Sequence, residues 1–135
     1  LKQFERYPAM LERRKEIIRR YDEKLKPLGV TVLPHYTNAY ESSGHLYITQ
    51  IPNITYEQRG EIIEKMAERE IACNVHYKPL PMHTAYKNLG FDIKDYPNAY
   101  NHFAHEITLP LHTCLTDEQV NYVIDNYVDI LREYI

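Results

Sequence analysis

The chain has 135 residues, a length that suits one domain, because two separate halves would each bury too little surface to be stable. Nineteen acidic and sixteen basic side chains give a net charge of -3, so no overall positive field exists to draw the chain onto nucleic acid. No apolar run approaches the ~20 residues of a membrane-spanning helix, and residues 1–6 do not form a secretory signal. The composition, with 44% apolar residues, indicates a globular domain with a core.

The cysteine content indicates a reducing compartment. Cys73 and Cys114 form neither a CxxC pair nor a disulfide framework, so we expect two reduced thiols in a cytoplasmic protein. Because the sequence does not begin with methionine, we also expect it to be a piece of a longer protein.

The first predicted element is an amphipathic helix over residues 4–28. Its apolar side chains recur at multiples of three and four residues: Phe4, Tyr7, Leu11, Ile18, Tyr21, Leu25 and Leu28. Pro8 predicts either a kink near Tyr7 or a helix that starts with Pro8 in its first turn, and Pro27 and Gly29 end the helix. The outer face carries charges of both signs, which favours a solvated surface with ion pairs over a nucleic-acid interface.

Short strands and further helices follow. Strands are predicted over residues 30–33, 45–51, 71–77 and 109–111. Thr55 and Gln58 have the spacing of a capping box at the start of a helix, and Thr116 and Gln119 repeat it before the last helix. Between them, a short helix or an irregular turn is predicted over residues 83–89, and another helix starts with Pro97 in its first turn. The order predicts an α+β fold, a two-layer sandwich in which helices cover a small, largely antiparallel sheet.

Two arrangements of reactive side chains give weak predictions. His102, His105 and Glu106 share a helical segment, but they lack the HExxH order and a further ligand, which favours solvated histidines over a metal site. His112 and Cys114 could act as base and nucleophile, but side chains at a strand end point apart, which favours a packed thiol.

A third arrangement follows the predicted strand over residues 71–77. The loop carries two imidazoles, an ammonium group and two phenols: His76, Tyr77, Lys78, His83 and Tyr86. Its prolines restrict the backbone, which lowers the entropy cost of holding these groups in place. From the pattern alone, a binding loop and a polar loop with solvated side chains both remain open.

Longer motifs give a resemblance to a known family. The stretch NVHYKPLPMHTAYKNLGFDIKDYPNAYNHFAHEITLPLHTCLTDEQVNYVI resembles the C-terminal domain of the DegT/DnrJ/StrS sugar aminotransferases. Upstream, LERRKEIIRRYDEKL is similar to the helix after the large domain of that family, and SSGHLYITQI to the first long strand of its small domain. The resemblance covers essentially the whole chain. It departs at Glu70, where relatives often carry glycine, and at residues 81–83, where the loop varies in length.

The resemblance implies a single C-terminal domain over residues 1–135, with the helix of residues 1–28 leading in from an absent large domain that binds pyridoxal phosphate. It implies a cytoplasmic, homodimeric full-length enzyme that transfers an amino group, from glutamate, to a nucleotide-linked keto sugar for surface polysaccharide or glycoconjugate biosynthesis. The small domain of such an enzyme contributes substrate-binding residues, which here are His76, Tyr77, Lys78, His83 and Tyr86.

The same resemblance limits what this chain can do alone. None of its eight lysines lies in a context like that of the Schiff-base lysine of the family, and no glycine-rich phosphate loop is present. We therefore expect the isolated chain to bind no pyridoxal phosphate or metal and to be inactive. The alternative is a stand-alone α+β module that binds a small ligand or has a regulatory role.

Overall fold

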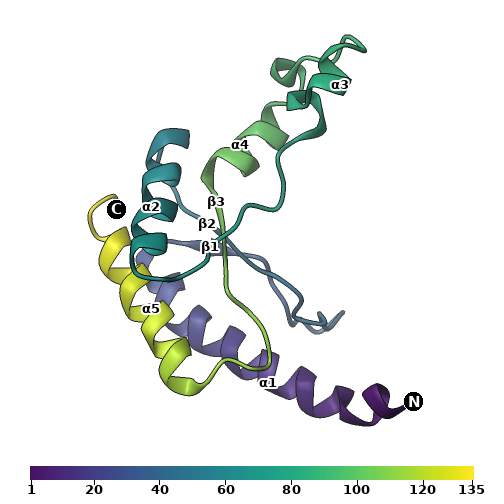
Figure 1. The fold of residues 1–135 in the computed structure, drawn as a ribbon, viewed down its shortest axis with the longest axis vertical. Helices are drawn as coiled ribbons and strands as arrows, with labels where there is room; N and C mark the ends of the chain where they lie inside the picture. The colour runs from purple at the N-terminus through teal and green to yellow at the C-terminus, as the bar shows by residue number, and fades with distance from the viewer.

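The elements of the computed structural model, which describes residues 1–135, follow one another in the order α-β-β-α-α-α-β-α (Figure 1). The helices are α1 (Lys2–Leu25), α2 (Tyr56–Glu68), α3 (Thr84–Lys87), α4 (Pro97–His105) and α5 (Asp117–Leu131). The strands are β1 (Thr31–Val32), β2 (Tyr47–Gln50) and β3 (Glu106–Leu109). Short 3-10 turns lie at Lys26–Leu28, Leu80–Met82 and Ile93–Asp95.

The three strands form an antiparallel sheet in the order β1-β2-β3, in which Thr49 lies opposite Ile107. Tyr47 and Thr49 point to the same face, where α1, α2 and α5 supply most of the buried apolar side chains. The tyrosine and threonine hydroxyls on this face are satisfied: Tyr127 Oη lies 2.8 Å from Thr49 Oγ1, which donates to the carbonyl of Ile107. The predicted α+β sandwich with a small antiparallel sheet is therefore confirmed.

Helix α1 begins before Pro8 and runs through it. The prediction of a helix that starts with Pro8 in its first turn is therefore wrong. Pro8 has no N–H to donate, so one backbone hydrogen bond is missing inside the helix. At the other end, Gly29 closes the helical segment with a left-handed φ of 83°, as its position predicts.

The predicted strand over residues 71–77 does not form. Asn74 makes a single antiparallel bridge to Thr108, with N–O distances of 3.1 and 2.8 Å. Two residues later, the N–H of His76 donates to a side-chain oxygen of Glu106 instead of a backbone carbonyl. The ladder stops there because its next partner is a carboxylate. The last strand also lies earlier than predicted, at Glu106–Leu109, since α4 ends at His105.

Both predicted capping boxes are present, at Thr55 with Gln58 and at Thr116 with Gln119. Helix α2 ends in a Schellman motif, in which the N–H groups of Glu70 and Ile71 donate to the carbonyls of Ala67 and Met66. This motif places Glu70 at a φ of 58°, a left-handed conformation that favours glycine.

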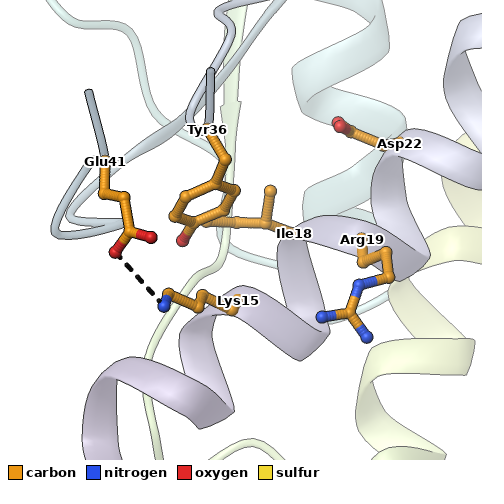
Figure 2. Close-up of a pocket in the computed structure, with 6 residues that line it drawn as sticks. All are labelled: Lys15, Ile18, Arg19, Asp22, Tyr36 and Glu41. Atoms are coloured by element: carbon orange, nitrogen blue, oxygen red, sulfur yellow. Dashed lines mark ion pairs between the residues drawn. The ribbon is translucent and has the colours of Figure 1, made fainter. Parts of the chain in front are cut away.

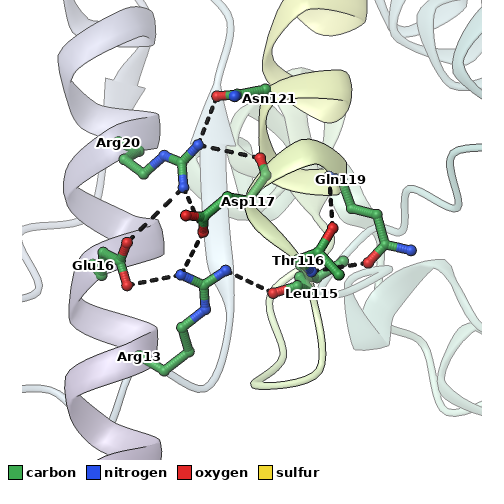
Figure 3. A network of polar contacts seen from close by, with 8 residues as sticks. All are labelled: Arg13, Glu16, Arg20, Leu115, Thr116, Asp117, Gln119 and Asn121. Atoms are coloured by element: carbon green, nitrogen blue, oxygen red, sulfur yellow. Dashed lines mark hydrogen bonds and ion pairs between the residues drawn. The ribbon is translucent and has the colours of Figure 1, made fainter.

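A network of charged groups joins α1 to the start of α5 (Figure 3). Arg13 lies 2.7 Å from Glu16 and 2.8 Å from Asp117, and Arg20 lies 2.9 Å from Asp117. The hydrogen bond from Arg13 is the main cause that lowers the pKa of the Asp117 carboxyl. The charged face of α1 therefore makes ion pairs, as its mixed charges predict.

The start of α1 and the segment that carries α3 both project from the sheet and its covering helices (Figure 1). At the start of α1, residues 1–10 are all exposed. The segment that carries α3, residues 77–101, exposes Tyr77, Leu80, Leu89 and Phe91. None of the helices is long and apolar enough to span a bilayer.

Candidate functional site

The loop that begins at His76 is held against β3 by two hydrogen bonds from His76 itself. Its backbone N–H donates to Oε2 of Glu106 at 2.8 Å, and its ring Nδ1 lies 2.9 Å from Oγ1 of Thr108. The Thr108 hydroxyl also donates to Oε1 of Glu106 through a short hydrogen bond. The other ring nitrogen of the half-buried His76, Nε2, has no partner in the chain and is open to solvent. One edge of the imidazole is therefore fixed, and the other faces outward.

Glu106 is the buried acidic side chain at this site, with none of its surface exposed. Burial of a carboxylate is costly unless its oxygens are hydrogen-bonded, and here one oxygen accepts from His76 and the other from Thr108. Glu106 and Thr108 both belong to β3, which is buried along its whole length.

Sequence reasoning considered Glu106 only as a metal ligand and did not single out Thr108. The available signal was a glutamate in a segment that also carries the apolar residues Phe103, Ala104, Ile107 and Leu109, where a buried ionisable residue needs partners.

The structure places the other predicted residues unequally around His76. The exposed Tyr77 ring stands at 83° to the imidazole with centroids 4.6 Å apart, and the exposed Lys78 makes no ion pair. Nε2 of His83 lies 3.4 Å from the carbonyl of Lys78, which brings the second imidazole back to the same loop.

Tyr86 belongs to a different surface of the projecting segment. Its ring lies 6.0 Å from that of Phe91, and both line an apolar hollow of about 440 Å³. The remaining lining residues are Pro79, Leu80, Pro81, Tyr96 and Ala99. The structure therefore brings four of the five predicted residues to the His76 loop and places the fifth in a neighbouring apolar hollow.

The other two arrangements do not assemble as sites. No three His, Cys, Asp or Glu side chains lie together in a group that could hold a metal ion, and Glu106 is used by His76 and Thr108. Cys114 and His112 are both exposed and make no hydrogen bond to each other, so the prediction of a packed thiol at Cys114 is wrong. Cys73 is the more shielded thiol, and burial raises its pKa to about 12.

A second hollow, of about 300 Å³, lies between α1 and the loop of residues 35–41 (Figure 2). Lys15, Arg19 and Asp22 line it from α1, and Tyr36 and Glu41 line it from the loop. The Lys15 ammonium lies 3.4 Å from Glu41 and 3.1 Å from Glu12, so its charge is already compensated.

The lysines of the chain do not fit a pyridoxal-phosphate site. A Schiff-base lysine needs a shielded position in which its amine can lose its proton. None of the eight lysines is buried, and the two that are half-buried, Lys15 and Lys65, are ion-paired with glutamates. None of these lysines therefore has the shielded setting that a Schiff-base lysine needs.

Comparisons with known proteins give matches that cover nearly the whole chain or all of it. The sequence model of the DegT/DnrJ/EryC1/StrS aminotransferase family matches residues 1–128. Spore coat polysaccharide biosynthesis protein SpsC of Bacillus subtilis is 30% identical over 138 residues, which cover 98% of this chain and 35% of SpsC. The PLP-form structure of the putative sugar aminotransferase Spr1654 from Streptococcus pneumoniae has 50% identity and a TM-score of 0.95, covering 100% of this chain and 34% of that one.

The UDP-4-amino-4,6-dideoxy-N-acetyl-beta-L-altrosamine transaminase of Campylobacter jejuni is 29% identical and is covered over 35% of its length. The chain thus spans about a third of the length of each of these relatives.

Proposed function

Because this chain belongs to the DegT/DnrJ/EryC1/StrS aminotransferase family, we propose that it forms the C-terminal small domain of a pyridoxal-phosphate enzyme that aminates a nucleotide-linked keto sugar. The observation that carries this proposal is the match of the entire chain to one third of a putative sugar aminotransferase. In the proposed enzyme, α1 leads in from a large domain that supplies the Schiff-base lysine. The exposed apolar stripe at the start of α1, with Phe4 and Tyr7, supports a domain that covers it.

The proposed role of the His76 loop is to hold the sugar nucleotide with its carbonyl over the coenzyme. Fixing two reactants in the correct geometry lowers the entropic part of the barrier. The outward edge of His76 can hydrogen-bond to the sugar, and the unpaired Lys78 ammonium can bind a diphosphate oxygen. The exposed Tyr77 ring offers a face to the sugar or the base.

Pyridoxal phosphate, when bound in the full-length enzyme, supplies the electron sink for amino-group transfer. In the proposed enzyme, the residues of this chain only bind and orient the sugar. The proposal also includes glutamate as the amino donor, a homodimeric assembly and a cytoplasmic location. It assigns the enzyme to surface polysaccharide or glycoconjugate synthesis. The polysaccharide role is supported by the name of SpsC, and the nucleotide-sugar substrate by that of the Campylobacter transaminase.

The experiment uses the full-length protein from the gene that contains these residues. Incubated with pyridoxal phosphate, glutamate and a panel of UDP- and dTDP-linked keto sugars, it is expected to form an amino sugar that mass spectrometry detects. His76→Ala is expected to raise the KM for the sugar at least tenfold and leave the KM for glutamate unchanged. His112→Ala, at an exposed histidine outside the loop, is the matched control. Failure to aminate any member of the panel contradicts the proposal.

Titration of the isolated chain distinguishes this function from a stand-alone binding module. Calorimetry with UDP-N-acetylglucosamine and dTDP-glucose is expected to give no binding in the micromolar range, because the loop forms only one wall of the proposed site. Micromolar affinity for either compound, without another domain, favours the module.

A further inference from the structure

We infer that Glu106 and Thr108 fix His76 as the tautomer that carries its proton on Nδ1, so that Nε2 is an acceptor for a substrate hydroxyl. The tautomer follows from the hydrogen bonds of this chain, whereas the substrate part rests on the proposed function. Glu106 and Thr108 are positioning residues in this inference, since they act through His76.

The first step concerns the two hydrogen bonds that Glu106 accepts. The backbone N–H of His76 can only donate, so Oε2 of Glu106 must accept at 2.8 Å. The Thr108 hydroxyl approaches the other oxygen, Oε1. Both oxygens of Glu106 therefore act as acceptors, and the hydrogen bond that runs from Thr108 to Oε1 is the premise of the next step.

The second step follows from the single hydrogen of a hydroxyl group. If Thr108 donates that hydrogen to Glu106, Oγ1 offers only lone pairs to its other neighbour. Nδ1 of His76 lies 2.9 Å from Oγ1, so the hydrogen between them must come from the imidazole. In a neutral imidazole with Nδ1 protonated, Nε2 has no hydrogen and can only accept.

The consequence is a specific preference at the exposed edge of the ring. A neutral His76 accepts a hydrogen bond from a sugar hydroxyl through Nε2, and it has no hydrogen there to donate to a phosphate oxygen. The inference therefore assigns His76 to the sugar part of the substrate and leaves the diphosphate to cationic groups such as Lys78.

One substitution is expected to reverse the direction of the two hydrogen bonds that run from His76 Nδ1 to Thr108 and from Thr108 to Glu106. In Glu106→Gln, the amide oxygen can still accept from the N–H of His76, while the amide nitrogen now donates to Thr108. The Thr108 hydroxyl must then donate to Nδ1, which moves the imidazole proton to Nε2. Thr108→Val removes both of these hydrogen bonds, and Thr108→Ser keeps the hydroxyl and serves as the matched control.

The test is two-bond ¹H–¹⁵N correlation NMR of the ¹⁵N-labelled chain, about two pH units above the ordinary histidine pKa of ~6.5. We expect a pyrrole-type shift at Nδ1 and a pyridine-type shift at Nε2 of His76 in the wild type and in Thr108→Ser. We expect the two types to be exchanged in Glu106→Gln. Protonation at Nε2 in the wild type overturns the inference, and so does an unchanged tautomer in a folded Glu106→Gln. The wild-type spectrum decides by itself if the variant does not fold.

A second readout separates this inference from the proposed function. In the full-length enzyme, Glu106→Gln is expected to raise the KM for the sugar nucleotide about tenfold and leave that for the amino donor unchanged. An enzyme that aminates the sugar with an unaltered KM in this variant overturns the role of Nε2 as acceptor. A wild-type enzyme that aminates no sugar contradicts the proposed function, while the NMR result still decides the tautomer.

Discussion

Nη2 of Arg13 in α1 lies 2.6 Å from the carbonyl oxygen of Leu115, two residues before α5 begins. This hydrogen bond joins segments that are 102 positions apart in the sequence. The same guanidinium uses Nη1 to contact the carboxylates of Glu16 and Asp117 (Figure 3). Arg13 therefore connects the first helix to the start of the last one.

Arg13→Ala is expected to lower the free energy of unfolding by about 1–2 kcal/mol, because it removes a charge-assisted hydrogen bond and two partly solvated ion pairs. Urea unfolding followed by circular dichroism measures the change. Arg19→Ala is the control, since Arg19 lies on the same helix, is exposed and makes no ion pair. Equal losses for the two variants would mean that the contact with Leu115 contributes nothing.

Glu70→Gly is expected to raise the free energy of unfolding by about 0.5–1 kcal/mol. Glycine relieves the cost of a left-handed residue, and its larger entropy in the unfolded chain offsets part of that gain. Asn53→Gly is the matched control, because Asn53 has a φ of 62° but asparagine tolerates this conformation. A neutral or negative effect of Glu70→Gly in denaturant titrations contradicts the strain argument.

The parts of the fold that depend on local sequence could be predicted, and those that depend on distant partners could not. The capping boxes at Thr55 and Thr116 and the turn at Gly29 need only nearby residues, and all three are present. The strand predicted over residues 71–77 has a suitable alternation of side chains. Its formation depends on β3, where the Glu106 carboxylate takes the N–H of His76.

Burial of His35 is expected to make the chain less stable in acid. Its ring stacks on Tyr47 at 6.0 Å, its Nδ1 lies 3.1 Å from Ser42, and its buried Nε2 has no partner. Desolvation lowers the pKa of His35, so the unfolded chain binds a proton more readily than the folded one. The stabilising effect is complete above pH ~6.5 and is lost as the pH falls below that value toward the folded pKa.

Thermal unfolding between pH 8 and pH 5 tests this expectation. His35→Phe keeps an aromatic ring beside Tyr47 and is expected to show a smaller loss of Tm below pH ~6.5 than the wild type. His45→Gln, at an exposed histidine, is expected to follow the wild type. Parallel curves for His35→Phe and wild type would show that this imidazole does not contribute.

Deletion of residues 1–9 is expected to change the free energy of unfolding by less than about 0.5 kcal/mol, because none of these residues is buried. Their contacts are a ring stack between Phe4 and Tyr7 and an ion pair between Lys2 and Glu5. For comparison, Ile17→Ala in the buried part of the same helix is expected to cost about 2–5 kcal/mol. A large loss on deletion would show that the exposed end of α1 stabilises this domain by itself.

The loop that carries the candidate site could be predicted from the sequence, but the contacts of its side chains with distant residues could not. His76 and Lys78 could be selected because prolines restrict the backbone of a loop that carries several polar groups. The hydrogen bonds of His76 to Glu106 and Thr108 span 30 and 32 positions, and no local pattern encodes them. Tyr86 follows the loop closely in the sequence, whereas its ring packs on Phe91 outside it.

The proposal that the Schiff-base lysine lies outside this chain is tested most directly by trapping the coenzyme. The chain is incubated with equimolar pyridoxal phosphate, reduced with borohydride and analysed by intact mass and peptide mapping. Only partial modification, spread over several exposed lysines, is expected. One equivalent of reduced adduct on a single lysine would contradict the proposal.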